Sequence, residues 1–157
     1  MSDKIRVAVY LRVACMDDNA IEKQKTTLRI YAQEQGYNDI AEYSDNGYNG
    51  LNFDRPAFMQ MTNDIRAGLI NKIIVKDISR ISRNYIQFGE WLDDMRRKNV
   101  SVISINDGLD SEKYNAVYAS FAEAIRKYYR ENHSQRIKSG IAHSRRRKAE
   151  QAAKLSD

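Results

Sequence analysis

Residues 5–18 read IRVAVYLRVACMDD, and the apolar part of this run decides the fold. Val7, Val9 and Leu11 alternate with other side chains, which predicts a strand from Ile5 to Val13, because successive residues of a strand point to opposite faces. The strand is expected to end directly after Arg12. The sequence thus places a basic side chain at the end of its first strand.

The same kind of apolar run recurs along the chain, in alternation with helical periods. Further strands are predicted over Ile40–Tyr43, Lys72–Val75 and Ser101–Ile105. Helices are predicted around Ile21–Tyr31 with Gly36 as the stop, from Pro56 to near Gly68, and over Tyr85–Lys98. This order of elements predicts an α/β fold with a mainly parallel central sheet that is flanked by helices.

The pattern changes after Asp107-Gly108. From about Lys113 onward, apolar and aromatic residues recur mostly at three- and four-residue intervals, which predicts one long amphipathic helix of about 35–40 residues and about 55–60 Å. We therefore expect a core over residues 1–110 and a long helix over residues 111–157. Because a core of this size cannot cover such a helix, we predict oligomerisation through the aromatic stripe of the helix. The stripe residues are Tyr114, Tyr118, Phe121 and Ile125.

The net charge of +5 is unevenly distributed. The stretch from Arg126 to Lys148 contains nine basic residues and one acidic residue, Glu131. This stretch therefore carries a charge of +8, and the remaining chain carries −3. A charge run alone is typical of a solvated helix end, but together with the arginine loops described next it favours contact with nucleic acid. The predicted DNA-binding residues are Arg126, Arg130, Arg136, Lys138, Arg145, Arg146 and Arg147.

Composition excludes several classes of protein. The 157 residues are 30% charged and 42% hydrophobic, as in an ordinary soluble domain. They contain no apolar run of about 18 residues and no signal-peptide pattern. One cysteine rules out an internal disulfide, so a cytoplasmic protein is expected. Neither Cys15 nor the two histidines, His133 and His143, has metal-site spacing, and no metal or other cofactor is predicted.

Charged side chains gather where the predicted strands end. These residues are Arg12, Asp45, Arg55, Lys76, Arg80 and Arg83. In parallel sheets the working groups collect beyond the carboxyl ends of the strands. Because burying an unpaired guanidinium is costly, we expect the arginines to lie outside the core. Some could form surface pairs with Asp17, Asp45 or Asp77, but their number favours a phosphate site. Clustered guanidiniums can stabilise phosphoryl transfer without a metal.

Three motifs carry a family resemblance: YLRVACMDD at residues 10–18, YSDNGYNGLNFDRP at 43–56 and IIVKDISRISRN at 73–84. Together they resemble the catalytic domain of the serine recombinases of the resolvase/invertase type, in particular the large members. The resemblance covers nearly the whole chain. It implies site-specific DNA cleavage and strand exchange through a phosphoserine intermediate, without a cofactor, by dimers that pair into a synaptic tetramer on double-stranded DNA. The implied context is a bacterium, a phage or another mobile element.

The resemblance also implies residue roles. The residues that would bind the scissile phosphate are Arg12, Arg55, Arg80 and Arg83. Gln24 would support the nucleophile loop, and Asp45 would order the arginines. Ala14 occupies the place of the serine nucleophile in the family pattern Tyr-x-Arg-Val-Ser. The separate C-terminal DNA-binding region of active relatives is expected to be absent from a chain that stops at Asp157.

Alanine has no group that can attack phosphorus, so the chain is predicted not to cleave DNA. Two explanations stay open: Ala14 replaces the serine of an active recombinase, or the protein is a naturally inactive paralogue that acts as a DNA-binding or oligomerisation partner. Cys15 could substitute as nucleophile, but one step along a strand end reverses the side-chain direction, so an inert, at least half-buried cysteine is predicted. A receiver- or flavodoxin-like binding domain would offer an acidic pocket or a phosphate loop instead.

Overall fold

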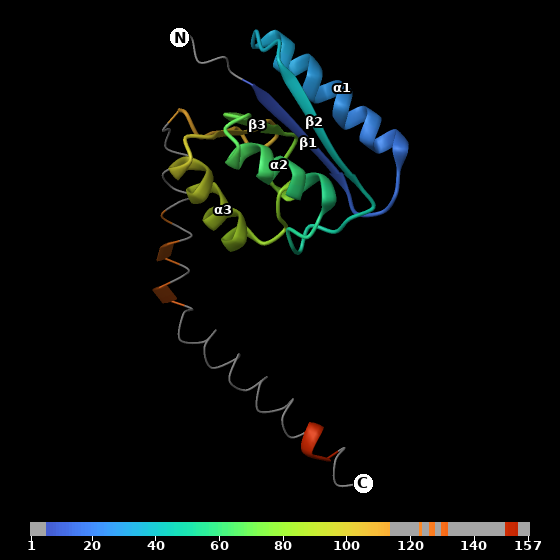
Figure 1. Ribbon diagram of the computed structural model, residues 1–157, viewed down its shortest axis with the longest axis vertical. Coiled ribbons are helices and arrows are strands. Elements are labelled where there is room, and N and C mark those ends of the chain that lie inside the picture. The colour runs from blue at the N-terminus through green and yellow to red at the C-terminus, as the bar shows by residue number, and fades with distance from the viewer. Residues whose placement is uncertain (1–5, 114–122, 124–125, 128–129, 132–149, 154–157) are drawn as a thin grey trace. The chain divides into compact units, whose positions relative to one another are not determined.

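The computed structural model describes residues 6–113, 123, 126–127, 130–131 and 150–153. Its centre is a five-stranded sheet in the order β2-β1-β3-β4-β5 (Figure 1). The strands are β1 (Val7–Val13), β2 (Ile40–Asn46), β3 (Lys72–Val75), β4 (Ser101–Ser104) and β5 (Leu109–Asp110). The first four strands are parallel to one another, and β5 runs antiparallel to β4. The predicted α/β class with a mainly parallel sheet is confirmed.

Helices cover both faces of this sheet (Figure 1). They are α1 (Asp18–Glu34), α2 (Pro56–Arg66) and α3 (Tyr85–Arg97), and a short 3-10 turn, η1 (Ile78–Arg80), follows β3. Val7, Val9 and Leu11 pack with Leu28 and Ala32 of α1, which confirms the predicted strand face. The other face packs against α2 and α3 in a larger cluster that is rich in aromatic side chains.

Polar groups fix where each helix begins. Asp17 caps α1, since its carboxylate accepts a hydrogen bond from the backbone N–H of Ala20 at 3.0 Å. Pro56 occupies the first turn of α2, as predicted from its fixed φ. Asn84 caps α3 through the N–H groups of residues 86 and 87. All three helices therefore start at defined positions beyond the carboxyl ends of β1, β2 and β3.

Two features of the sheet differ from the prediction. β2 extends beyond Tyr43 to Asn46, because it pairs with the whole length of β1, from Val7 opposite Ile40 to Val13 opposite Asn46. β5 was not predicted at all, since two residues are too few to show an alternating pattern. The longer β2 matters for function, because it brings the polar residues of its end beside the end of β1.

The chain divides into two compact units, Met1–Phe121 and Ala122–Asp157. In the second unit the described residues 123, 126–127, 130–131 and 150–153 have helical backbone. Tyr114, Tyr118, Phe121, Ile125, Arg136, Lys138, Arg145, Arg146 and Arg147 lie outside the described residues. The long helix, the boundary at residue 110 and the roles of this stretch thus stay predictions. No helix among the described residues is long and apolar enough to span a membrane.

Candidate phosphate-binding site

Three loops meet beyond the carboxyl ends of β1, β2 and β3. The backbone N–H groups of Gly47 and Tyr48 donate to the carbonyl oxygen of Val13 at 2.9 and 3.0 Å, which ties the loop after β2 to the end of β1. The N–H of Arg83 donates to the carbonyl oxygen of Gly50 at 2.9 Å, which ties the loop after β3 to the loop after β2. The predicted site residues are thereby brought together by main-chain contacts.

Arg12 lies at the centre of these loops and is 1% exposed. Its guanidinium donates to three main-chain carbonyl oxygens: from Nε to Arg80 at 3.1 Å, from Nη1 to Tyr48 at 2.9 Å and from Nη2 to Ser79 at 2.6 Å. The backbone of Arg12 is held in turn by Gln24, whose Nε2 donates to the Arg12 carbonyl at 3.1 Å and whose Oε1 accepts from the Arg12 N–H at 3.3 Å. Gln24 is thus placed to support the end of β1.

Arg55 is buried to the same degree, at 1% exposure. Its Nε donates to the carbonyl oxygen of Asn52 at 3.1 Å, and its Nη1 donates to the carbonyl oxygen of Arg80 at 2.8 Å and to the hydroxyl of Tyr10 at 2.9 Å. Its Nη2 donates to the carbonyl oxygen of Ile81. Arg55 thereby fixes the turn that carries Arg80.

The expectation that the arginines lie outside the core was wrong for Arg12 and Arg55. Its premise, the cost of burying an unpaired guanidinium, does not apply, because main-chain carbonyl oxygens surround both groups and accept their hydrogen bonds. Burial lowers the pKa of both side chains, and for Arg12 the positive charge of Arg55 lowers it further. Sequence alone did not show which carbonyls a folded loop would offer.

Asp45 acts on the arginines through an intermediate side chain. Its carboxylate accepts hydrogen bonds from the hydroxyl of Tyr10 at 2.6 Å and from the N–H groups of Ala57 and Phe58 at 2.9 and 3.0 Å. It therefore caps α2 and reaches Arg55 through Tyr10. Burial, and then the hydrogen bond to Asp45, raise the pKa of Tyr10 above its ordinary value, so this hydroxyl keeps its proton. Tyr10 is a site residue that sequence reasoning missed.

Arg80 and Arg83 are the more accessible members of the group. The Arg80 side chain is 24% exposed, donates from Nη1 to the carbonyl oxygen of Arg12 at 2.9 Å and lies 3.4 Å from a carboxylate oxygen of Asp77. Arg83 is exposed, and its Cγ would lie 3.0 Å from a Cβ atom on Gly50. We refer to Arg12, Arg55, Arg80 and Arg83 as the guanidinium cluster.

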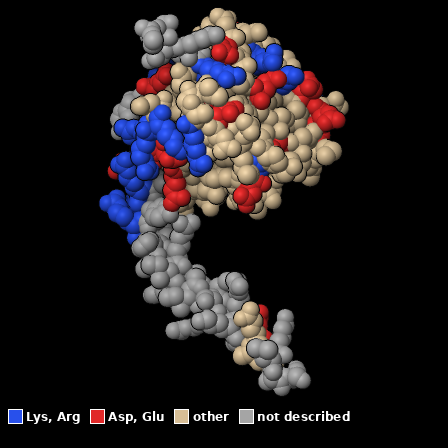
Figure 2. All heavy atoms as spheres, viewed as in Figure 1, with Lys and Arg blue, Asp and Glu red and all other residues tan. Residues whose placement is uncertain are grey.

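The guanidinium cluster is a local excess of positive charge. The pKa of Arg12 is lowered by burial and by the charges of Arg55, Arg83 and Arg80, so these three groups lie within electrostatic reach of Arg12. On the face of the molecule that Figure 2 shows, basic and acidic side chains both lie at the surface. Forked donors that stay charged bind the oxygens of a phosphate well. The cluster is therefore suited to a phosphate or phosphodiester.

Position 14 lies at the edge of this cluster. Ala14 is exposed and follows Arg12, whose carbonyl oxygen holds Arg80, by two residues. Cys15 is exposed as well, so the prediction of an at least half-buried cysteine was wrong. The reason is that β1 ends at Val13 and the next residues leave the sheet before α1 begins. Packing in the core is therefore not the reason for a cysteine at position 15.

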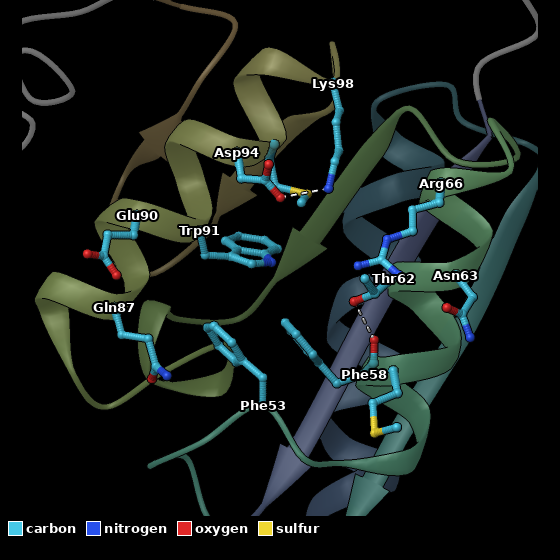
Figure 3. A pocket seen from close by; sticks show the side chains of 12 residues that line it. Phe53, Phe58, Thr62, Asn63, Arg66, Gln87, Glu90, Trp91, Asp94 and Lys98 are labelled. Carbon is cyan, nitrogen blue, oxygen red and sulfur yellow. Dashed lines mark hydrogen bonds and ion pairs between the residues drawn. The ribbon is translucent and has the colours of Figure 1, made fainter.

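A hollow of about 530 Å³ lies apart from the predicted site residues, between α2 and α3 (Figure 3). Phe53, Phe58 and Trp91 point into it, and an ion pair of 2.7 Å joins Lys98 to Asp94 at one end. The Arg55 guanidinium lies 4.6 Å from the centre of the Phe58 ring, so the aromatic floor of the hollow also supports the guanidinium cluster. Among the described residues, no three His, Cys, Asp or Glu side chains are grouped as for a metal ion.

Comparisons with known proteins agree with this picture. The family model "Resolvase, N terminal domain" matches residues 7–150. A Bacillus subtilis (strain 168) protein named "Putative DNA recombinase" is 26% identical over 136 residues, which are 85% of this chain and 27% of that protein. The chain thus spans about a quarter of the length of this relative.

Two solved structures are also similar. The N-terminal catalytic domain of TP901-1 integrase is 26% identical, with a TM-score of 0.72 over 80% of this chain and 97% of that one. A resolvase family site-specific recombinase from Streptococcus pneumoniae is 28% identical, with a TM-score of 0.70 over 91% and 99%.

Proposed function

Since this chain belongs to the resolvase family of serine recombinases, we propose that residues 6–113 form a recombinase catalytic domain that holds a DNA phosphodiester at the guanidinium cluster and does not cut it. One observation carries the proposal. Arg80 donates to the carbonyl oxygen of Arg12, so the charged cluster is attached to the strand end from which Ala14 projects. The proposal therefore assigns the cluster and the nucleophile position to one site.

The four arginines have different roles, which depend on how exposed each side chain is. Arg80 and Arg83 are accessible and contact the non-bridging oxygens of the phosphate. Arg12 and Arg55 are buried, so they hold the loops in place and add positive charge from behind. Gln24 keeps the end of β1 in position through two hydrogen bonds to the Arg12 backbone.

The missing step is covalent. In an active relative, the serine hydroxyl loses its proton as its oxygen bonds to phosphorus, the bond from phosphorus to the 3′ oxygen of the neighbouring nucleotide breaks, and that 3′ oxygen takes up a proton. Ala14 offers only a methyl group at this place, so no phosphorus–oxygen bond can form there. The cluster would still bind the phosphodiester and would release it unchanged.

Two biological settings fit this chemistry. Either Ala14 replaces the serine of an active recombinase, or the chain is a naturally inactive paralogue that binds DNA as a non-catalytic partner. The hydrogen bonding around Arg12 and Arg55 fits both settings, because its main-chain acceptors do not depend on the residue type.

The test is the variant Ala14→Ser in the full-length protein, with a DNA that carries its recognition site. We expect a covalent protein–DNA adduct at the 5′ end of the cut, without added metal or nucleotide, and no adduct with Ala14. Adding Arg80→Ala should lower adduct formation by about 100-fold or more, since the developing charge loses a guanidinium. Paired sites that are not cut by the serine variant would favour the paralogue. Cleavage by the alanine form would contradict the proposal.

We extend the proposal to the partners of the chain, which are double-stranded DNA and further copies of itself. The basic stretch that includes Arg126 and Arg130 would approach the DNA backbone, and the aromatic stripe that begins at Tyr114 would join the copies into dimers and tetramers. Sedimentation at micromolar concentration should show a species larger than a monomer that grows with concentration. A strict monomer would contradict the self-association.

A further inference from the structure

A smaller hollow adjoins the guanidinium cluster. It has a volume of about 260 Å³ and is lined by Ser79, Ser82, Arg83 and Tyr85, so it lies where the turn after β3 passes into α3. Arg83 belongs both to this hollow and to the guanidinium cluster. Whatever occupies the hollow therefore lies directly beside an anion that the cluster holds.

The wall of the hollow is fixed by Ser82, which is 1% exposed. Its hydroxyl donates to Oε1 of Gln87 at 2.8 Å and accepts from the N–H of Asn84 at 3.0 Å. The side chain of Asn84 then accepts from the N–H groups of residues 86 and 87 at 3.0 and 3.2 Å. These contacts hold the backbone around Tyr85, the first residue of α3, in one arrangement.

The hollow presents two kinds of group to solvent: a guanidinium and an aromatic ring. The hydroxyl of Ser79 bonds to Asp77, and that of Ser82 is engaged as described, so neither defines the ligand. Arg83 is exposed and Tyr85 is 65% exposed. A guanidinium beside an accessible aromatic ring matches a phosphate that is followed by an unpaired nucleoside, because an unpaired base offers an open face for stacking.

We propose that this hollow is a nucleotide subsite, in which the ring of Tyr85 packs against an unpaired nucleoside next to the phosphodiester held by the guanidinium cluster. The subsite rests on the proposed function, because it presupposes a phosphodiester at the cluster. It would make Tyr85 a determinant of how the flanking nucleotide is held, independent of the missing nucleophile.

Two small ligands separate the subsite from the cluster: dimethyl phosphate, which is a phosphodiester alone, and dithymidine monophosphate, which adds a nucleoside on each side. Binding is followed by the NMR signals of the arginine Nε–H groups in the whole chain. We expect dithymidine monophosphate to bind about fivefold or more tightly than dimethyl phosphate, as one stacked base contributes. Tyr85→Phe should keep this ratio, while Tyr85→Ala should bring it to about one and leave dimethyl phosphate binding unchanged.

Two further variants serve as controls. Tyr85→Leu keeps an apolar side chain but loses the flat ring, so it should behave like Tyr85→Ala and replaces it if the alanine variant does not fold. Leu69→Ala changes a side chain that is 48% exposed beyond the end of α2, and it should keep the full ratio. An equal affinity of the unsubstituted chain for both ligands, or a ratio that survives Tyr85→Ala, would overturn the subsite alone. Arginine signals that respond to neither ligand would contradict the proposed function as well.

Discussion

A Cβ atom on Gly50 would lie 2.9 Å from Nη2 of Arg12. The same atom would lie 3.0 Å from Cγ of Arg83, so two arginines of the cluster pack against a residue without a side chain. The carbonyl oxygen of Gly50 also accepts the hydrogen bond from the Arg83 N–H. The close approach of these groups therefore depends on a glycine in the loop after β2.

Gly50→Ala should weaken dimethyl phosphate binding by about tenfold or more, because the added methyl group displaces a guanidinium whose charge-assisted hydrogen bonds are the strong ones. NMR titration of the arginine Nε–H signals measures the change. Gly68→Ala is the matched control: its φ of +74° makes a side chain strained, but the space around it is open. That variant should lose about 1 kcal/mol of stability and bind the ligand normally. Normal binding by Gly50→Ala would contradict the argument.

Tyr10→Phe should lower the free energy of unfolding by about 1–3 kcal/mol near neutral pH. The hydroxyl connects Asp45 to Arg55 in the buried part of the site, and its loss leaves both groups short of one hydrogen bond. Urea unfolding monitored by the single tryptophan gives the value. A variant as stable as the parent chain would show that this hydroxyl contributes nothing.

Alkaline pH should destabilise the fold through buried tyrosines. Burial and a carboxylate partner raise the pKa of Tyr10 and of Tyr43 above 10.0, the ordinary value. Below about pH 10 both states keep these protons, so stability is unaffected. Above it the unfolded chain releases protons that the folded chain retains, and stability falls by at most about 1.4 kcal/mol per pH unit for each tyrosine.

Unfolding midpoints between about pH 8 and pH 11 test this, and Tyr10→Phe should show a shallower decline than the parent chain. An equal decline in both proteins would assign the effect to other groups.

Much of the fold follows from the sequence because its signals are local. The alternation of Val7, Val9 and Leu11 predicted both β1 and the face that packs against α1. Pro56 marked the start of α2, and the apolar run 72–75 gave β3 with its observed bounds. Each of these signals lies within a few neighbouring residues, so no knowledge of the folded chain was needed.

The site was harder to predict, because its contacts join residues far apart in the chain. The loop motifs singled out arginines that lie near one another in the structure, but Arg12 and Arg80 are 68 positions apart and meet through a main-chain oxygen. Such an acceptor leaves no mark in the sequence. The part of Tyr10 was missed for a similar reason, since a tyrosine in a buried strand is typical of ordinary packing.

Glu112→Gln should destabilise the chain by about 1–2 kcal/mol, a moderate value because the Glu112 side chain is 58% exposed. Its carboxylate lies 3.0 Å from Nζ of Lys72, which is buried at the start of β3 and 5.0 Å from the centre of the Tyr37 ring. Lys72→Met should cost less, because an apolar side chain removes the charge and keeps the contact with the ring.

The stability that the Lys72–Glu112 pair contributes should depend on pH in the acidic range. The hydrogen bond from Lys72 lowers the pKa of Glu112 below its ordinary 4.5. The contribution of the Glu112 carboxylate to the free energy of unfolding is therefore complete above pH 4.5. It is lost as the pH falls further, through the pKa of the folded state. Comparing thermal unfolding of the parent chain and Glu112→Gln from about pH 7 to pH 3 should show the two curves converging at low pH. A constant difference would contradict the assignment.

DNA binding by this chain should be weak, sensitive to salt and largely independent of sequence, because it rests on the basic stretch 126–148. Each neutralised phosphate contributes about 0.9 to the slope of log affinity against log salt concentration. Replacing Arg145, Arg146 and Arg147 by glutamine should flatten this slope, as measured by fluorescence anisotropy with a short duplex. Glutamines in place of Arg96, Arg97 and Lys98 at the end of α3 remove the same number of charges and provide the control. An unchanged slope would identify the stretch as a solvated helix end.

The acceptors of the buried guanidiniums have a consequence for how freely this site can change its sequence. Arg12 and Arg55 donate to the carbonyl oxygens of residues 48, 52, 79, 80 and 81, and every amino acid supplies such an oxygen. Substitutions at the partly exposed positions 48 and 79 can therefore alter the outer surface of the loops, while the hydrogen bonds of the buried guanidiniums persist. A chain whose loop residues change can in this way keep the buried geometry while its outer surface changes.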